Sequence, residues 1–153
     1  MVTDFDDRAL LPEYHVDDAD RLYAVLRTQV DVVLPTGVAV LNAASSALIE
    51  MATLCDGEVI FFARNDAVLP ALTPKTPGEV FLRNDAEVLR RAGREEILMP
   101  LNQLPACNVK PIRSDIPVVG ALTMDQHLDS LLAAIAAAWA LDMSHDTIRN
   151  GMA

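Results

Sequence analysis

The sequence predicts a mixed α/β domain: a βαβ unit, an antiparallel β-meander and a buried alanine-rich helix. Two short, unbroken apolar runs at 38–42 and 58–63 flank a stretch with helical spacing, the pattern of parallel strands buried on both faces. Charged and apolar residues partly alternate over 79–99, which favours half-exposed antiparallel strands. Five of the six residues in 133–138 are alanine, the strongest helix former.

Composition limits the classes of function that are compatible with the chain. Its 153 residues, 52% of them hydrophobic, suffice for one domain with a substantial core. The net charge of −10 would repel a phosphate backbone, so we expect no nucleic-acid partner. No apolar run reaches the ~20 residues that a membrane span needs. The acidic N-terminus and two isolated cysteines, Cys55 and Cys107, predict a cytoplasmic protein with buried, reduced thiols.

The N-terminal half supplies the βαβ unit. Residues 1–16 are acidic and irregular, and we expect one domain over 17–153. Apolar residues recur at helical spacing over 17–33, where Asp17 or Asp18 can cap the helix start.

A turn then leads into the first predicted strand, 38–42. A second helix over 43–54, capped by Ser45 or Ser46, connects it to the strand at 58–63. Strands joined in this way are parallel, and their crossover is right-handed.

The C-terminal half supplies the meander and the alanine-rich helix. Strands are expected at 79–83, 87–90 and 95–99, followed by a proline-interrupted connection at 102–120. The helix at 128–143 carries an apolar stripe, and its alanines allow close approach to a sheet, so we expect cover on more than one side. The stripe consists of Leu128, Leu131, Leu132, Ile135 and Trp139. Ser144 is expected to cap a short final helix.

Few residues form a pattern typical of catalysis. The six glycines are scattered and neither lysine follows a glycine, so a phosphate loop of the Walker type is not predicted. The three histidines lack the spacing of a metal site, and we expect no bound metal. Arg90, Arg91 and Arg94 could bind an anionic partner, but on an exposed meander we expect them to be solvated.

Asn42 ends a buried strand, and ligands in α/β proteins bind at the carboxyl ends of strands. Its side chain either binds a ligand or holds the next loop in place, and the sequence leaves both open. His127 precedes the alanine-rich helix and either faces a ligand or is a surface or capping residue. An enzyme using His127 near Asn42 is a further hypothesis, for which no triad partner is visible.

Four stretches together resemble cyanophycin synthetase, specifically the second half of its Mur-ligase-like central domain. They are Val33–Ala43, Met51–Phe62, Leu131–Leu141 and Ile148–Met152. The resemblance implies a partial Mur-ligase central domain and an ATP-dependent carboxylate–amine ligase that works through an acyl phosphate with Mg²⁺. In that family the product is a polymer of aspartate carrying arginine.

The chain also departs from the family at positions that bind nucleotide. Where the family reads Asn-Ala-Asp-Asp-Pro, this chain reads Asn42-Ala-Ala-Ser-Ser46. Ser130 replaces the asparagine that helps hold adenine in the superfamily, and Gln126-His127 replaces the preceding His-Asn pair. Asn42, His127 and Ser130 are therefore the nucleotide-binding positions that the resemblance implies.

The family's Walker loop, ATP-grasp domain and C-terminal domain have no counterpart in this sequence. We therefore expect a chain that is not catalytic alone and binds neither ATP nor Mg²⁺ by itself. The alternative is a non-catalytic binding or assembly module that self-associates or docks on a full-length ligase. Uncovered sheet edges and apolar helix faces would favour such contacts.

Overall fold

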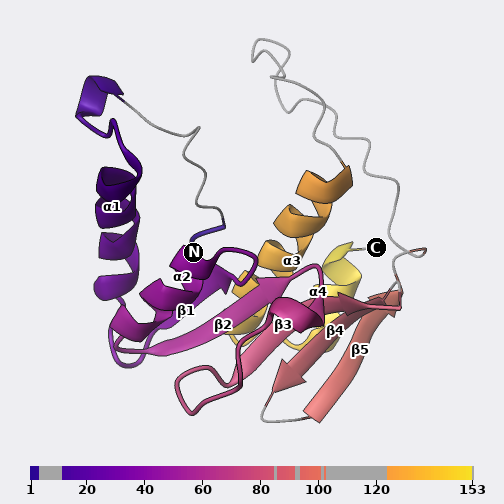
Figure 1. The fold of residues 1–153 in the computed structure, drawn as a ribbon. Coiled ribbons are helices and arrows are strands. Elements are labelled where there is room, and N and C mark those ends of the chain that lie inside the picture. Colours follow the sequence, from indigo (N-terminus) through magenta and orange to yellow (C-terminus); the bar gives the residue numbers. More distant parts are fainter. Residues whose placement is uncertain (4–11, 85, 92–93, 101, 103–123, 153) are drawn as a thin grey trace.

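In a computed structural model, the chain folds into a five-stranded mixed sheet with helices on both faces (Figure 1). The structure describes residues 1–3, 12–84, 86–91, 94–100, 102 and 124–152, with only the backbone described at 124–127. The strands are β1 (Val38–Asn42), β2 (Glu58–Ala63), β3 (Gly78–Arg83), β4 (Ala86–Arg91) and β5 (Arg94–Pro100). The helices are α1 (Ala19–Asp31), α2 (Ser46–Met51), α3 (Met124–Ala140) and α4 (His145–Met152). Short 3₁₀ turns are η2 (Pro12–Tyr14), η3 (Ala52–Leu54) and η4 (Asp66–Val68).

The strands follow one another across the sheet in chain order, β1-β2-β3-β4-β5. β1 and β2 are parallel, as the βαβ prediction requires, and β3, β4 and β5 form the predicted antiparallel meander. β3 also pairs in parallel with β2, with Gly78 opposite Ile60. The meander is therefore a continuation of the parallel sheet, and β3 belongs to both parts.

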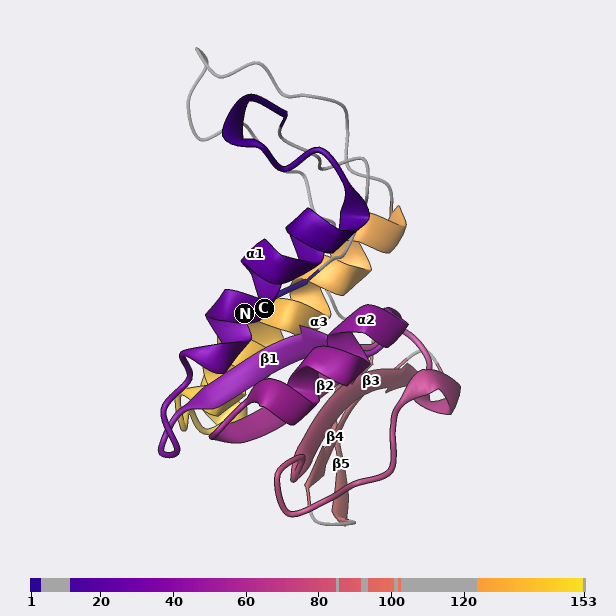
Figure 2. The same cartoon turned by 60° about the vertical axis from the view of Figure 1, so that its left-hand side comes forward.

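Alternate side chains of the sheet enter two separate cores. On one face Leu41 and Phe61 pack with α1, α2 and Cys55, whose thiol is buried and free. On the other face Val40 and Phe62 pack with α3 and α4. Figure 1 and Figure 2 show α2 and α3 on opposite sides of β1 and β2. This three-layer arrangement follows from strands that are apolar at every position.

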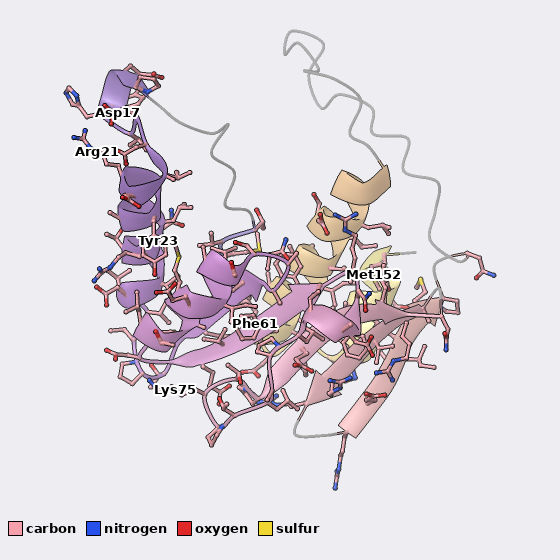
Figure 3. The ribbon with its side chains drawn as sticks, in the orientation of Figure 1. Asp17, Arg21, Tyr23, Phe61, Lys75 and Met152 are labelled. Carbon is pink, nitrogen blue, oxygen red and sulfur yellow. The ribbon has the colours of Figure 1, made fainter. Side chains whose placement is uncertain are left out.

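The helix caps agree closely with the sequence prediction. The side chain of Asp18 accepts a hydrogen bond of 2.7 Å from the backbone N–H of Arg21, and Ser144 caps α4 through the N–H of Thr147. Figure 3 shows Asp17 and Arg21 together at the start of α1, where they form an ion pair of 3.1 Å. Ser45 occupies the N-cap of α2 but makes no capping bond through its side chain.

The alanine-rich helix has different ends from those predicted. It begins at Met124 and ends at Ala140, because Asp142 adopts a left-handed backbone with φ of 57°. The N–H of Asp142 then bonds the carbonyl of Trp139 at 2.9 Å, which closes the helix. Leu132, Ile135 and Trp139 are buried, as the stripe predicts, whereas Ala134 is exposed. The helix is thus open to solvent on one side.

One further expectation was wrong. β3 and β4 are mostly buried rather than half exposed, because α3 and α4 cover one face of the meander and arginine side chains cover the other. Within the acidic N-terminal segment, Val2 is 5% exposed and bridges to β1 through a hydrogen bond of 2.9 Å to the carbonyl of Val40.

The segment at 103–120, with Cys107, lies outside the described residues. In the described residues, no helix combines the length and apolarity that a bilayer crossing requires.

Candidate functional site

The two edges of the parallel strands present different chemistry. Trp139, near the C-terminal end of α3, lines a cavity with Val38 and Gly78, the first residues of β1 and β3. α3 therefore runs antiparallel to the parallel strands β1, β2 and β3. Its first half therefore lies toward the carboxyl ends of the strands. The predicted positions Asn42 and Ser130 are consequently at the same edge of the sheet.

Asn42 is 8% exposed, and both polar atoms of its side chain have partners within the fold. Its amide Nδ2 donates to the carbonyl of Thr3 at 2.9 Å. Its Oδ1 accepts from the backbone N–H of Ala44, also at 2.9 Å. Asn42 thus holds the next turn in place, which is one of the two roles that the sequence left open, and it also fixes the N-terminal segment against β1.

The neighbourhood of Ser130 is likewise polar and internally bonded. Ser130 is exposed on α3, and the adjacent Asp129 forms an ion pair of 2.9 Å with Arg64, directly after β2. His127 lies on α3 one turn nearer the helix start, and its side chain is outside the description. The carboxyl edge therefore carries groups of both charges that already pair with each other.

The opposite edge is hollowed around Trp139. A cavity of about 270 Å³ lies between the strand starts and the end of α3. A larger one of about 760 Å³ lies between the β4–β5 hairpin and the turn from α3 to α4. Trp139 and Arg91 line both. We refer to the larger cavity as the Trp139 cleft; its lining is Leu89, Arg91, Arg94, Glu95, Glu96, Trp139 and His145.

Gly78 explains how the indole reaches this position. A Cβ atom at Gly78 would lie 3.1 Å from the Trp139 ring, closer than nearly all such contacts in proteins. The absence of a side chain therefore lets α3 sit tightly on the start of β3. The guanidinium carbon of Arg91 lies 5.8 Å from the ring centroid, and the His145 ring meets the indole edge-on at 6.2 Å.

A network of ion pairs covers the other face of the meander. Arg83 bonds Asp66 and Glu95, each at 2.7 Å, and Arg90 bonds Glu95 at 2.9 Å and Glu79 at 2.8 Å. Both guanidinium groups lie over the ring of Phe81. The network closes this face with charges that satisfy each other.

The pKa values in this network follow from its contacts. Hydrogen bonds from Arg83 lower the pKa of Asp66 and of Glu95. Burial raises the pKa of Glu79, although the nearby Arg90 opposes that shift. The buried end of the network is therefore held by a single guanidinium group.

Glu87 is the most unusual titratable side chain of the described residues. It lies on β4 and is 0% exposed. Neither of its carboxylate oxygens has a hydrogen-bond partner among the described residues. Burial raises its pKa to about 7. Glu87 is thus a carboxyl group that the fold favours in its neutral form.

The comparisons with known proteins leave the family open. No family model matches the chain, and no curated protein sequence matches it. Among the described residues, no group of three or more histidine, cysteine or acidic side chains is arranged to hold a metal ion.

The sequence reasoning missed the Trp139 cleft. Trp139 was expected only as part of the apolar stripe, and Arg91 and Arg94 were expected to be solvated. The close spacing of these arginines after an apolar strand was the available signal. Their proximity to Trp139, far along the chain, depends on tertiary structure.

Proposed function

We propose that this chain is a cyanophycin-synthetase-like domain that binds no nucleotide by itself and acts as a cytoplasmic binding or assembly module. The proposal rests on the four stretches that resemble this family, which cover much of the sheet start and of the helices that follow the meander. Val33–Ala43 and Met51–Phe62 contain β1 and much of β2, and Leu131–Leu141 and Ile148–Met152 lie on α3 and α4. A partial Mur-ligase central domain is the fold that the proposal assigns.

The observation that carries the proposal is the bonding of Asn42. In the resembling family this position binds nucleotide, yet here its donor contacts Thr3 and its acceptor contacts Ala44. Releasing either bond would leave a buried polar group without a partner, which costs about 1–3 kcal/mol. A nucleotide at this edge would have to displace the N-terminal segment first.

The first test is calorimetric titration of the intact protein with Mg-ATP. We expect no binding tighter than about 1 mM. Replacing Asn42 by Ala should reduce the free energy of unfolding without changing that result. Tight binding of Mg-ATP, or its hydrolysis by the purified chain, would contradict the proposal.

Assembly is favoured by the outer strand of the meander. In the described part of the chain, β5 pairs on one side only, and the first four of its residues are exposed. Ile97 on this strand is 63% exposed. An unpaired strand with an exposed apolar side chain suits a second copy of the chain or a full-length ligase as partner.

The second test is light scattering coupled to size exclusion. We expect the parent to form a dimer or larger species, and Ile97→Lys to shift it toward the monomer, since edge lysines oppose strand pairing. Val32→Lys, at another highly exposed apolar position, directly after α1, is the matched control. A parent that stays monomeric and does not bind a full-length ligase would count against assembly.

A further inference from the structure

Two arginines stand opposite each other at the mouth of the Trp139 cleft. Arg91 and Arg94 are register partners on β4 and β5, so their side chains leave the sheet on the same face. Directly opposed residues of an antiparallel pair have Cβ atoms about 4.5–5.5 Å apart, and like charges in that position destabilise the sheet. The pair therefore creates a local positive potential that an anion would relieve.

The two carboxylates that line the cleft, Glu95 and Glu96, already have other partners. Glu95 accepts hydrogen bonds from Arg83 and Arg90. Glu96 lies 2.7 Å from Nδ1 of His145 and 3.9 Å from a guanidinium nitrogen of Arg149. No carboxylate of the described residues forms an ion pair with Arg91 or Arg94, so both guanidinium groups can still form paired bonds with an anion.

The cleft also has an apolar floor. Trp139 is 8% exposed and forms the base together with Leu89, while Arg91 lies over the indole ring. The volume of about 760 Å³ is within the usual range for a small-molecule site. A doubly charged group at the mouth and a less polar body on the indole would match both parts.

We propose that the Trp139 cleft binds a small dianion, with Arg91 and Arg94 bonding its charged oxygens and Trp139 contacting the rest of the ligand. Phosphate groups and dicarboxylates share this chemistry, because a guanidinium group can form paired N–H···O bonds with either. A monocarboxylate would leave one arginine uncompensated. This site is independent of the proposed assembly, since it requires no partner chain.

The test uses the fluorescence of Trp139, which is the single tryptophan of the chain and therefore reports from the cleft itself. The intact protein is titrated with inorganic phosphate, succinate and acetate at constant ionic strength. We expect a saturable change with phosphate or succinate, and binding of acetate weaker by about tenfold or more. A response to only one of the two dianions identifies which class the cleft takes.

Variants separate the site from general charge effects. Arg91→Gln and Arg94→Gln should each weaken binding of the dianion about tenfold, because each removes one charge-assisted contact. Arg27→Gln, on the exposed side of α1, removes the same charge elsewhere and should leave binding unchanged. Thermal unfolding monitored by circular dichroism verifies that each variant is folded.

Three results would overturn the site. They are no saturable response to either dianion, equal binding of acetate and the dianions, or an equal loss of binding in Arg27→Gln.

Discussion

At the scale of single residues, Glu87 makes stability depend on pH. Its pKa of about 7 in the folded state is above the ordinary value of 4.5, so the folded chain holds this proton more tightly than the unfolded chain does. The contribution of Glu87 is therefore fully present below about pH 4.5 and is lost as the pH rises through about 7. Its size is on the order of 3 kcal/mol.

Replacing Glu87 by Gln should remove this dependence. We expect Glu87→Gln to be more stable than the parent at pH 8 and similar to it at pH 5, because the amide stays neutral throughout. Urea unfolding at a series of pH values measures the effect, and Glu50→Gln on the exposed side of α2 is the control for loss of one carboxyl group. Parallel stability profiles for the parent and Glu87→Gln would contradict this account.

At the scale of elements, one ion pair with a buried carboxylate links β3 to β4. The side chain of Glu79 is 1% exposed and bonds Arg90 at 2.8 Å. Arg90→Ala would leave that carboxylate buried without its cation, and we expect a loss of about 3–5 kcal/mol in the free energy of unfolding. Arg21→Ala breaks an ion pair whose side chains are both 55% exposed and should cost about 1 kcal/mol or less. Similar losses from the two changes in denaturant unfolding would exclude a special role for Arg90.

The turn before β2 gives a second element-scale prediction. A Cβ atom at Gly57 would lie 2.6 Å from the carbonyl oxygen of Leu34 and even closer to that of Gly37, and neither backbone group can move away easily. We expect Gly57→Ala to destabilise by about 1–3 kcal/mol, as overpacking does. At Gly151 in α4 a Cβ meets nothing within 4 Å, so Gly151→Ala should be neutral or stabilising by up to about 1 kcal/mol. Thermal unfolding compares the stability of the two variants. An equal change in stability would mean that the contacts at Gly57 do not determine the cost of adding a Cβ atom there.

At the scale of the whole molecule, the sequence predicted those features that local pattern determines. The runs at 38–42 and 58–63 form strands whose consecutive apolar side chains are covered on both faces of the sheet. Asp18 and Ser144 cap helices because their side chains reach a backbone N–H three residues ahead.

Features that depend on distant segments were not predictable in the same way. β3 pairs in parallel with β2, and at its start Gly78 leaves room for Trp139, which comes from α3 much later in the chain. Asn42 was singled out because it ends a buried strand, but its partner Thr3 is separated from it in the sequence by α1. The Trp139 cleft similarly combines a hairpin with the end of a helix that no local pattern connects.

The position of α3 has a consequence for synthesis of the protein on the ribosome. The described sheet is complete by Pro100, but the apolar face formed by Val40, Ile60, Phe62 and Val80 is covered by α3 and α4, which begin at Met124 and His145. A nascent chain that has emerged only to the end of β5 therefore carries a finished sheet with one apolar face exposed to water. Such a form is prone to aggregate or to bind chaperones. Cover for this face therefore becomes available only after α3 and α4 have been synthesised.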